Sequence, residues 1–189
     1  MKSILLALRF LKGLERRLRT CILVGQGLRI GKGSFIGRGD IKNPHLIEMG
    51  DGCMIDDEVS LMVYTGTNSK SSGPSLLIGS NVHISRQTIF LCQGFIKIGD
   101  NVMVAPSCLF VDHNHGYKSR QLPIREQPGE VGQIVIEDDV WIGAGCKILK
   151  GVTIEKGAII GAGSVVTKNV STFEIWAGVP ARHISTRPI

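Results

Sequence analysis

An aliphatic residue recurs at every sixth position from residue 136 onward, without interruption. The positions are Ile136, Ile142, Ile148, Ile154, Ile160 and Val166. An α-helix repeats every 3.6 residues and a plain strand every two, so neither produces a strict period of six. A short strand and a turn together fit this length, and three such units close one triangular coil that stacks on the next. The repeat therefore predicts a parallel β-helix.

The same phase appears upstream in four blocks of three, with insertions between the blocks. These are Val24, Ile30 and Ile36; Ile47, Cys53 and Val59; Ile78, Ile84 and Phe90; and Ile98, Val104 and Phe110. Together with the continuous run, they make six triplets. We therefore expect an all-β domain of about six coils over residues 24–185, followed by a short tail at 186–189.

Glycine often follows one of these recurring residues, which we call markers. Examples are Gly31, Gly37, Gly79, Gly99, Gly143 and Gly161. Tight corners with positive φ favour glycine, so we expect the chain to turn there. Ala158 and Ser164 stand four places after markers, as a narrow interior requires.

Composition limits the rest of the interpretation. The chain has 189 residues, of which 43% are hydrophobic, enough for one sizeable core. Its five cysteines are widely spaced and form no CxxC pair. They indicate reduced thiols in a cytoplasmic protein, with neither a disulfide framework nor a zinc knot.

Residues 1–23 predict a separate amphipathic helix, because Ile4, Leu8, Leu11 and Leu18 recur at helical spacing. Residues 1–20 carry a net charge of +5 out of the formal +6 of the chain. The basic excess is therefore local, and we expect no nucleic-acid partner. The apolar run before Arg9 is too short for a signal peptide or a membrane span. Two alternatives remain open: the leucines pack on the domain with the arginines in solvent, or the helix lies on an anionic membrane surface.

Four stretches of the sequence resemble the hexapeptide-repeat acyltransferases, in particular the O-acetyltransferase branch that includes galactoside, maltose and xenobiotic acetyltransferases. They are IGDNVMVAP at 98–106, VWIGAGCKILKGVTI at 140–154, GAGSVVTKNV at 161–170 and AGVPAR at 177–182. The resemblance implies a left-handed β-helix and acetyl transfer from acetyl-CoA, which is a co-substrate, with no metal required. It also implies a homotrimer whose active sites lie between subunits.

The sequence FVDHNHGY at 110–117 contains the best candidate for a catalytic base. Counted from Phe110, Asn114 falls at an inward place, His115 at an outward place and His113 at a corner. The family's catalytic histidine stands ten residues after the alanine of an AP pair, and His115 stands ten after Ala105. A neutral imidazole suits proton removal near neutral pH. We therefore predict that His115 is the base.

His113 and Asp112 are secondary candidates for the catalytic group. Asp112 could fix a histidine tautomer, as an acid does in a triad, or it could cap its own turn. His113 could assist in the site, contact the acceptor or be structural. The following residues 116–133 break the period, which predicts a protruding loop that could act as a lid or an acceptor-binding arm.

The resemblance also supplies candidates for binding CoA. Ala144 and Ala162 align with positions whose amides and small side chains let CoA approach, and the Ala144 amide is the candidate oxyanion donor. Thr167, Lys168 and Arg182 align with contacts to the CoA phosphates or adenine. Trp141 either flanks the pantetheine arm or packs between subunits.

The acceptor is harder to predict. Where sugar-acetylating relatives have an asparagine that contacts the acceptor, this chain has Ser85, with Gln87 close by. We expect a sugar hydroxyl, in a surface polysaccharide or a lipid-linked glycan, because the motif DHNHGY resembles polysaccharide-modifying members. An amino sugar or another small molecule is the alternative acceptor.

Two other functions use the same fold. A zinc enzyme of the carbonic anhydrase type would need His83, His113 and His115 as ligands, which leaves the CoA-type motifs unexplained. A β-helix that serves only as a scaffold subunit would not need the proposed base. We therefore expect an acetyltransferase.

Overall fold

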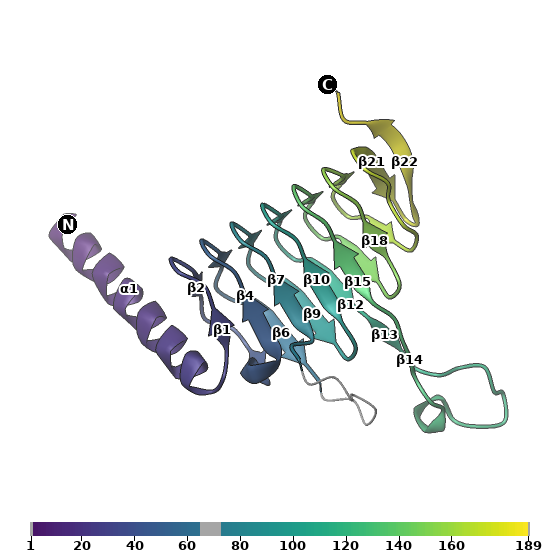
Figure 1. Ribbon diagram of the computed structural model, residues 1–189, viewed down its shortest axis with the longest axis horizontal. Helices are drawn as coiled ribbons and strands as arrows, with labels where there is room; N and C mark the ends of the chain where they lie inside the picture. Colours follow the sequence, from purple (N-terminus) through teal and green to yellow (C-terminus); the bar gives the residue numbers. More distant parts are fainter. Residues whose placement is uncertain (1, 65–72, 189) are drawn as a thin grey trace.

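The computed structural model describes residues 2–64 and 73–188, with side chains from residue 13 onward. A long helix, α1 (Lys2–Gly25), stands at the N-terminal end of a stack of coils (Figure 1). A hairpin of two strands closes the other end. No helix in the described part of the chain is long and apolar enough to cross a bilayer.

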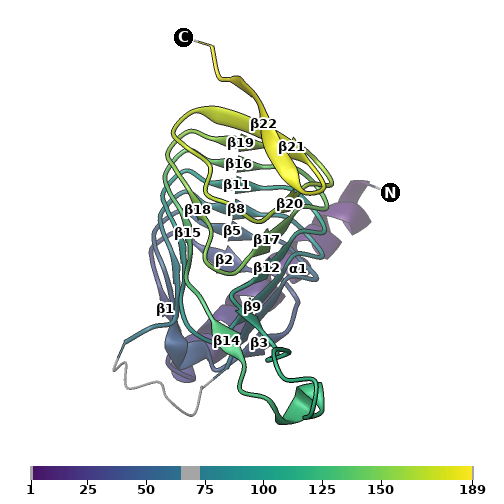
Figure 2. The same ribbon diagram turned by 90° about the vertical axis from the view of Figure 1, so that its right-hand side faces the viewer.

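Three parallel sheets form the sides of a triangular, left-handed β-helix with six coils (Figure 2). Sheet 1 contains β1 (Arg29–Ile30), β4 (Ile47–Met49), β7 (Leu76–Ile78), β10 (Ile96–Ile98), β15 (Ile134–Ile136) and β18 (Thr153–Ile154). Sheet 2 contains β2 (Phe35–Ile36), β5 (Met54–Ile55), β8 (His83–Ile84), β11 (Met103–Val104), β16 (Trp141–Ile142) and β19 (Ile159–Ile160), extended by β21 (Glu174–Gly178) and β22 (Ala181–Thr186). Sheet 3 contains β3 (Ile41–Lys42), β6 (Ser60–Val63), β9 (Ile89–Cys92), β12 (Leu109–Val111), β17 (Lys147–Leu149) and β20 (Val165–Val166).

Besides α1, a 3-10 turn and an arm lie outside these sheets. A 3-10 turn, η1 (Pro44–Leu46), precedes β4. An arm leaves the β-helix through β13 (His113–Asn114), contains η2 (Ile124–Glu126) and returns through β14 (Glu130–Val131) (Figure 2). The predicted protruding loop at 116–133 is therefore present, although the antiparallel pair β13–β14 begins it slightly earlier.

Two columns of side chains per sheet fill the core. One column contains the markers, such as Ile136, Ile142 and Ile148, which are fully buried. The other contains the residues two places earlier, such as Val140 and Cys146, which are equally buried. Burial of these aliphatic side chains is the main stabilising contribution in such a stack.

The predicted phase was wrong by two residues in the second block. Ile47, Cys53 and Val59 do point inward, but the strand register pairs Met49, Ile55 and Leu61 with the markers of the next coil. The first block also needs correction. Val24 lies in α1 and is exposed, and the third marker of the first coil is Ile41, which pairs with Leu61.

Glycines after the markers do not have positive φ, contrary to the prediction. They are required by close stacking of the coils: a Cβ on Gly143 would lie 2.6 Å from the Ala162 nitrogen, and one on Gly99 2.5 Å from Asp138 Oδ1. Positive φ occurs two residues later, as at Gly145 and Gln87. The sharp corner and the close approach are therefore two separate requirements.

All five cysteines are free, and the four in the β-helix are buried. Burial, reinforced by the nearby charge of Asp112, raises the pKa of the Cys92 thiol. A protonated, enclosed thiol is a poor nucleophile. The four buried cysteines are part of the hydrophobic core.

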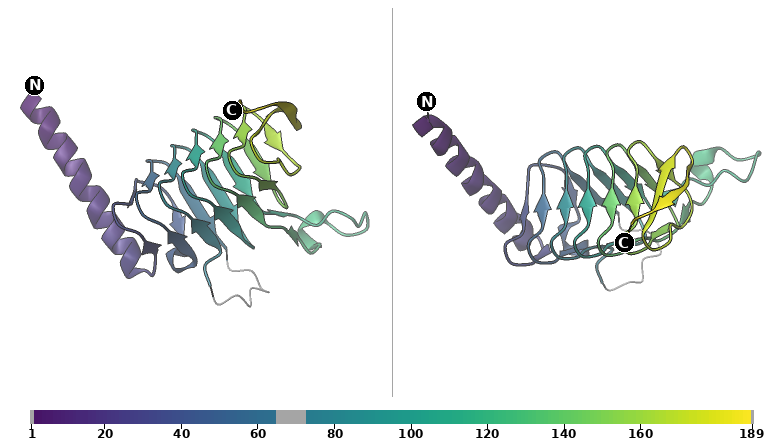
Figure 3. Two further views of the ribbon diagram at one scale, coloured as in Figure 1. Left: turned by 45° about the horizontal axis from the view of Figure 1, so that its top comes forward. Right: turned by 90° about the horizontal axis from the view of Figure 1, so that it is seen from above.

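The described leucines of helix α1 differ in burial, and the N-terminal end of the helix extends away from the coils (Figure 3). Leu23 is buried against the first coil, whereas Leu14 and Leu18 are exposed. Two basic side chains also reach the β-helix: Arg16 lies over the Phe35 ring at 5.3 Å, and Arg19 donates to the Gly39 carbonyl. Leu23 thus agrees with the first of the two sequence alternatives, whereas Leu18 does not. Side chains of residues 2–12, including Lys2 and Arg9, lie outside the described part.

Candidate active site

The candidate site residues lie on two edges of the triangular prism. We call the corner where the chain passes from sheet 2 to sheet 3 the 2–3 edge, and the corner from sheet 3 to sheet 1 the 3–1 edge. The two histidines of interest and the arm, which lies below β14 in Figure 2, belong to the 3–1 edge.

Asp112 is fully buried at the point where the chain leaves the fourth coil. Its carboxylate accepts hydrogen bonds from the backbone N–H of Gln93 at 2.9 Å and of Gly94 at 2.8 Å. Its Oδ1 lies 2.9 Å from Nδ1 of His113. The buried charge is therefore compensated by three donors, two of which belong to the preceding coil.

His113 is the histidine that the Asp112 carboxylate contacts. Its side chain is 21% exposed, and the Tyr64 ring meets it edge-on with centroids 6.4 Å apart. Donation from Nδ1 to Asp112 leaves Nε2 as an acceptor, which is the tautomer that a base requires. His113 lies in β13 and not at a plain corner of the coil.

His115 follows β13 and is exposed at the root of the arm. Its imidazole makes no hydrogen bond or ion pair with another described residue. Asn114 is also exposed, so the inward place predicted for it was wrong. The reason is that the chain leaves the coil at His113, and inward and outward places no longer follow the six-residue count.

The arm is held by its own polar contacts. The Gln127 amide bonds to Ser119 N, Ser119 O and Leu122 O, each at 2.9 Å. Gly116 is buried against Pro128, whose carbonyl leaves no room for a Cβ. Glycine is therefore required at this position.

Glu130 ties the base of the arm to the β-helix. Its carboxylate contacts Lys118 at 2.6 Å and Lys150 at 3.2 Å. The Lys118 hydrogen bond and then that of Lys150 hold the pKa of Glu130 below its usual value. The arm therefore returns to the same edge from which it leaves.

The 2–3 edge carries the other candidates. Ser85 and Gln87 lie between β8 and β9, Ala144 between β16 and β17, and Ala162 between β19 and β20. Gln87 donates to Glu58 at 3.1 Å and accepts from Ser107 at 3.2 Å. Ala144 and Ala162 are exposed and lie in adjacent coils.

Missing backbone capping distinguishes the Ala144 corner from other corners of the β-helix. Elsewhere, aspartates of the next coil accept from the corner amides: Asp100 from Ser80 N at 2.7 Å between sheets 1 and 2, and Asp57 from Arg38 N at 3.0 Å on the 2–3 edge. At the equivalent place above Ala144 stands Ala162, whose methyl group cannot accept a hydrogen bond. The N–H groups of Ala144 and Ala162 donate to no described residue. Unpaired, exposed amides of this kind can bind carbonyl or anionic oxygens of a ligand.

The remaining candidates are exposed and lie on different sides. Trp141 projects from sheet 2 and is 51% exposed, in register with Met103. Arg182 lies in β22 at the end of sheet 2. Thr167 and Lys168 follow β20 and therefore belong to the 3–1 edge. Lys168 has no ion-pair partner in the described chain.

One chain thus brings together Asp112, His113 and His115, but it separates them from the open amides of Ala144 and Ala162. Within the described residues, no three His, Cys, Asp or Glu side chains could hold a metal ion. His83 projects from sheet 2 beside Asp56, away from the histidines of the 3–1 edge. A three-histidine zinc site is therefore not formed within one chain.

Comparison with known proteins gives consistent results. Residues 133–168 match the family described as "Bacterial transferase hexapeptide (six repeats)". A putative acetyltransferase of Schizosaccharomyces pombe is 34% identical over 161 residues, covering 77% of this chain and 73% of the relative. A probable acetyltransferase of Mycobacterium tuberculosis is 30% identical over 159 residues, covering 82% and 50%, respectively. Galactoside O-acetyltransferase of Escherichia coli is 35% identical over 117 residues, covering 56% and 54%.

This chain therefore spans about half the length of the mycobacterial and Escherichia coli relatives. Among solved structures, a variant of AntD, an N-acyltransferase from Bacillus cereus, has a TM-score of 0.75 and 25% identity. The similarity covers 90% of both chains, and that protein is in complex with dTDP-4-amino-4,6-dideoxyglucose and coenzyme A.

Proposed function

Because the chain belongs to the bacterial hexapeptide-repeat transferase family, we propose that it transfers an acetyl group from acetyl-CoA to a sugar hydroxyl. The main observation in support is the open pair of amides at Ala144 and Ala162, which falls inside the family match at residues 133–168. We assign the transfer to the β-helix of residues 24–185 and treat residues 1–23 as a separate element.

The residues of the 2–3 edge are suited to the pantetheine part of CoA. Its amide groups need hydrogen-bond partners, and the small side chains of Ala144 and Ala162 leave room for an extended chain. Trp141 offers an apolar surface nearby on sheet 2. Lys168 and Arg182 would neutralise the phosphates, because both are exposed cations without an ion-pair partner in the described chain. Thr167 would add a hydroxyl contact.

In the proposed reaction His115 removes the proton from the acceptor hydroxyl as its oxygen attacks the thioester carbonyl. The new C–O bond forms, the C–S bond breaks, and CoA leaves with a proton returned from the imidazolium. In this proposal the Ala144 N–H, which donates to no described residue, donates to the developing oxyanion. No acyl-enzyme is required.

His113 is the second candidate for the base, and the Asp112 contact favours it. The alternative role for this pair is to fix the root of the arm, since Asp112 also binds the preceding coil. The variants His115→Ala and His113→Ala separate the two assignments. We expect His115→Ala to lower kcat by about 10² to 10⁴. A larger loss for His113→Ala than for His115→Ala, with both proteins folded, would transfer the role to His113.

We propose that Ser85 and Gln87 contact the acceptor, since they lie on the same edge as the donor amides. The acceptor would be a sugar within a surface polysaccharide or its lipid-linked precursor. N-acetylation of an amino sugar is the competing reaction, and the nucleotide-linked amino sugar bound by AntD supports it. We also propose a cytoplasmic location, which the free cysteines and the use of acetyl-CoA support.

We further propose a homotrimer in which the 3–1 edge of one subunit meets the 2–3 edge of the next. The separation of His115 from the open amides within one chain supports this, because both are needed at one carbonyl. Met103 and Trp141 are exposed cross-strand neighbours on sheet 2, and this apolar pair suits a subunit contact.

A CoA-release screen tests the reaction. Purified protein and acetyl-CoA would be mixed with free sugars, amino sugars and nucleotide sugars, and products analysed by mass spectrometry. The proposal predicts acceptor-dependent CoA release and a product heavier by one acetyl group on oxygen. Acetylation on nitrogen would favour the competing reaction. Binding of neither CoA nor any acceptor would favour a scaffold subunit.

A further inference from the structure

Helix α1 carries an exposed apolar stripe, part of which borders a groove between the helix and the first coils. Leu14, Leu18 and Ile22, spaced by four residues, are 56%, 62% and 55% exposed. The opposite side of the helix contacts the first two coils through Arg16, Arg19 and Leu23. An amphipathic helix normally buries its apolar side, so this stripe requires a partner that the single chain does not supply.

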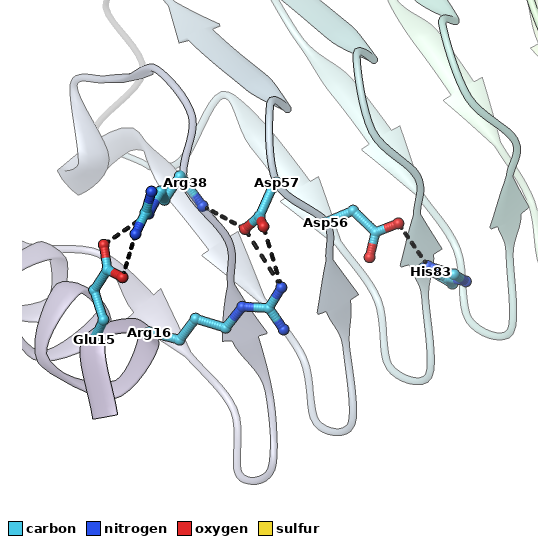
Figure 4. Close-up of polar contacts among 6 residues, drawn as sticks. All are labelled: Glu15, Arg16, Arg38, Asp56, Asp57 and His83. Atoms are coloured by element: carbon cyan, nitrogen blue, oxygen red, sulfur yellow. Dashed lines mark hydrogen bonds and ion pairs between the residues drawn. The ribbon is translucent and has the colours of Figure 1, made fainter. Parts of the chain in front are cut away.

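The helix is fixed to the β-helix by a charged cluster (Figure 4). Glu15 binds the Arg38 guanidinium through two contacts of 2.7 and 2.5 Å. Arg16 lies 3.4 Å from both oxygens of Asp57, which also accepts from Arg38 N at 3.0 Å. This Arg38 hydrogen bond and the charge of Arg16 lower the pKa of Asp57, which is therefore ionised at neutral pH. The direction of the stripe is thus set by specific contacts.

The stripe continues into an open groove between α1 and the first coils. The groove has a volume of about 620 Å³, and its aliphatic lining comes from Leu18, Ile22, Ile41 and Met62. Arg19, Lys42, Glu15 and Asp40 contribute its charged groups. The groove therefore combines aliphatic side chains with charged side chains that can contact the polar headgroups of a lipid layer.

Charge decides between the two partners that could cover this stripe. Residues 1–20 carry six basic residues and one acidic residue, so helices of several copies in one bundle would repel one another. In addition, the sequence ILLALRFL at 4–11 is apolar at seven of eight positions, far broader than the narrow seam of a coiled coil. A basic helix with a broad apolar side matches an anionic lipid surface instead.

We propose that α1 is an interfacial helix that docks the protein on an anionic phospholipid surface. Leu14, Leu18 and Ile22 enter the boundary between headgroups and acyl chains. Arg17, which is exposed beside the stripe, contacts lipid phosphate. Because the contacts of Glu15 and Arg16 fix the helix, docking also sets the orientation of the β-helix relative to the surface. This inference does not rest on the proposed acetyl transfer.

Vesicle sedimentation of the full chain tests the proposal. One set of vesicles contains phosphatidylglycerol mixed with phosphatidylcholine, and the other contains phosphatidylcholine alone. We expect at least about tenfold tighter binding to the anionic set, weakening as salt is raised, because exposed charges are screened. Equal binding to both sets, or no binding to either, would overturn the proposal.

The double variant Leu14→Ser, Leu18→Ser tests the apolar stripe, and Arg17→Glu tests the charge. Both change exposed side chains, so the fold should be retained, as checked by thermal unfolding. The double variant should lose at least about tenfold in affinity for anionic vesicles, because it removes two leucines that the lipid would bury on docking. Arg17→Glu should bind more weakly and with a smaller salt dependence.

The matched control is Val179→Ser, Ile184→Ser, which removes two equally exposed aliphatic side chains at the other end of the molecule. It should bind anionic vesicles like the unchanged protein. If the control and the helix variant lose affinity equally, the helix is not the docking surface. If the helix variant instead lowers the oligomeric state without changing vesicle binding, a second copy is the partner and the lipid proposal fails.

Discussion

At the scale of single residues, Asp112 connects three parts of the molecule. It anchors the backbone of Gln93 and Gly94, and it holds the His113 ring at the start of the arm. A fully buried carboxylate is tolerated only when its oxygens have such donors. The root of the arm and the preceding coil are therefore one structural unit.

Replacement of Asp112 by asparagine should destabilise this unit. One carboxylate oxygen becomes an NH₂ group, which then faces N–H donors, and an unsatisfied buried group costs about 1–3 kcal/mol. We expect a lower melting temperature by differential scanning calorimetry. Asp100→Asn is the control, because Asp100 is exposed and keeps an oxygen for Ser80 N. An equal loss in both variants would contradict the role given to Asp112.

Ala162→Asp should block the proposed CoA-binding amides of the 2–3 edge without unfolding the coil. The new carboxylate would cap the Ala144 N–H, as Asp100 caps Ser80 N on another edge. We expect KM for acetyl-CoA to rise about tenfold or more, because a negative charge also meets the CoA phosphates. Ser80→Asp adds the same charge away from the 2–3 edge and should leave KM unchanged. Equal KM values in Ala162→Asp and the parent protein would contradict the donor assignment.

The outward place predicted for His115 agrees with its exposure, whereas the inward place predicted for Asn114 does not. His115 and Ala162 were selected from short motifs, and both are exposed. The inward place given to Asn114 failed because the count assumes an unbroken coil, whereas tertiary contacts of Asp112 end the coil two residues earlier. The contact between Asp112 and His113 depends on that exit, so the period alone could not determine it.

At the scale of elements, the conformation of each coil depends on its contacts with the coils on either side. Strands of two to four residues cannot form a stable sheet alone, and in-register stacking supplies both hydrogen bonds and apolar contacts. Coils approach so closely at the corners that a side chain on the residue after a marker meets the backbone of the next coil.

Gly99→Ala should therefore destabilise the β-helix. Its Cβ would lie 2.5 Å from Asp138 Oδ1 and 2.7 Å from the Glu137 carbonyl carbon, and overpacking of this kind costs about 1–3 kcal/mol. Gly13→Ala on α1 meets nothing within 4 Å and should leave the melting temperature unchanged or raise it. No difference between the two variants in thermal unfolding would contradict the stacking argument.

The sheets were predictable because a strict period of six admits few structures. The second block was misassigned by two residues because Ile47 and Met49 both face inward, and composition cannot tell one inward column from the other. Only pairing with Ile78 identifies the marker. Similarly, helical spacing predicted α1, but the exposure of Leu14 and Leu18 depends on the contacts of Glu15 and Arg16 with the β-helix.

At the scale of the whole molecule, one chain divides the proposed chemistry between two edges. The base and the arm lie on the 3–1 edge, and the open amides lie on the 2–3 edge. Neither edge alone can both remove a proton from the acceptor and stabilise the oxyanion at the thioester carbon. The proposed reaction therefore requires neighbouring copies of the chain. The proposed docking of α1 would orient such an assembly on a lipid surface.

Mixing two impaired variants tests this most directly. His115→Ala would keep an intact donor edge, and Ala162→Asp would keep an intact base. Each is refolded alone and then together with the other, and acceptor-dependent CoA release is measured below KM for acetyl-CoA. If each site joins two copies, random mixed trimers should recover roughly a quarter of the parent activity. Activity no higher than the average of the two separate variants would contradict a site shared between His115 of one copy and Ala162 of the next.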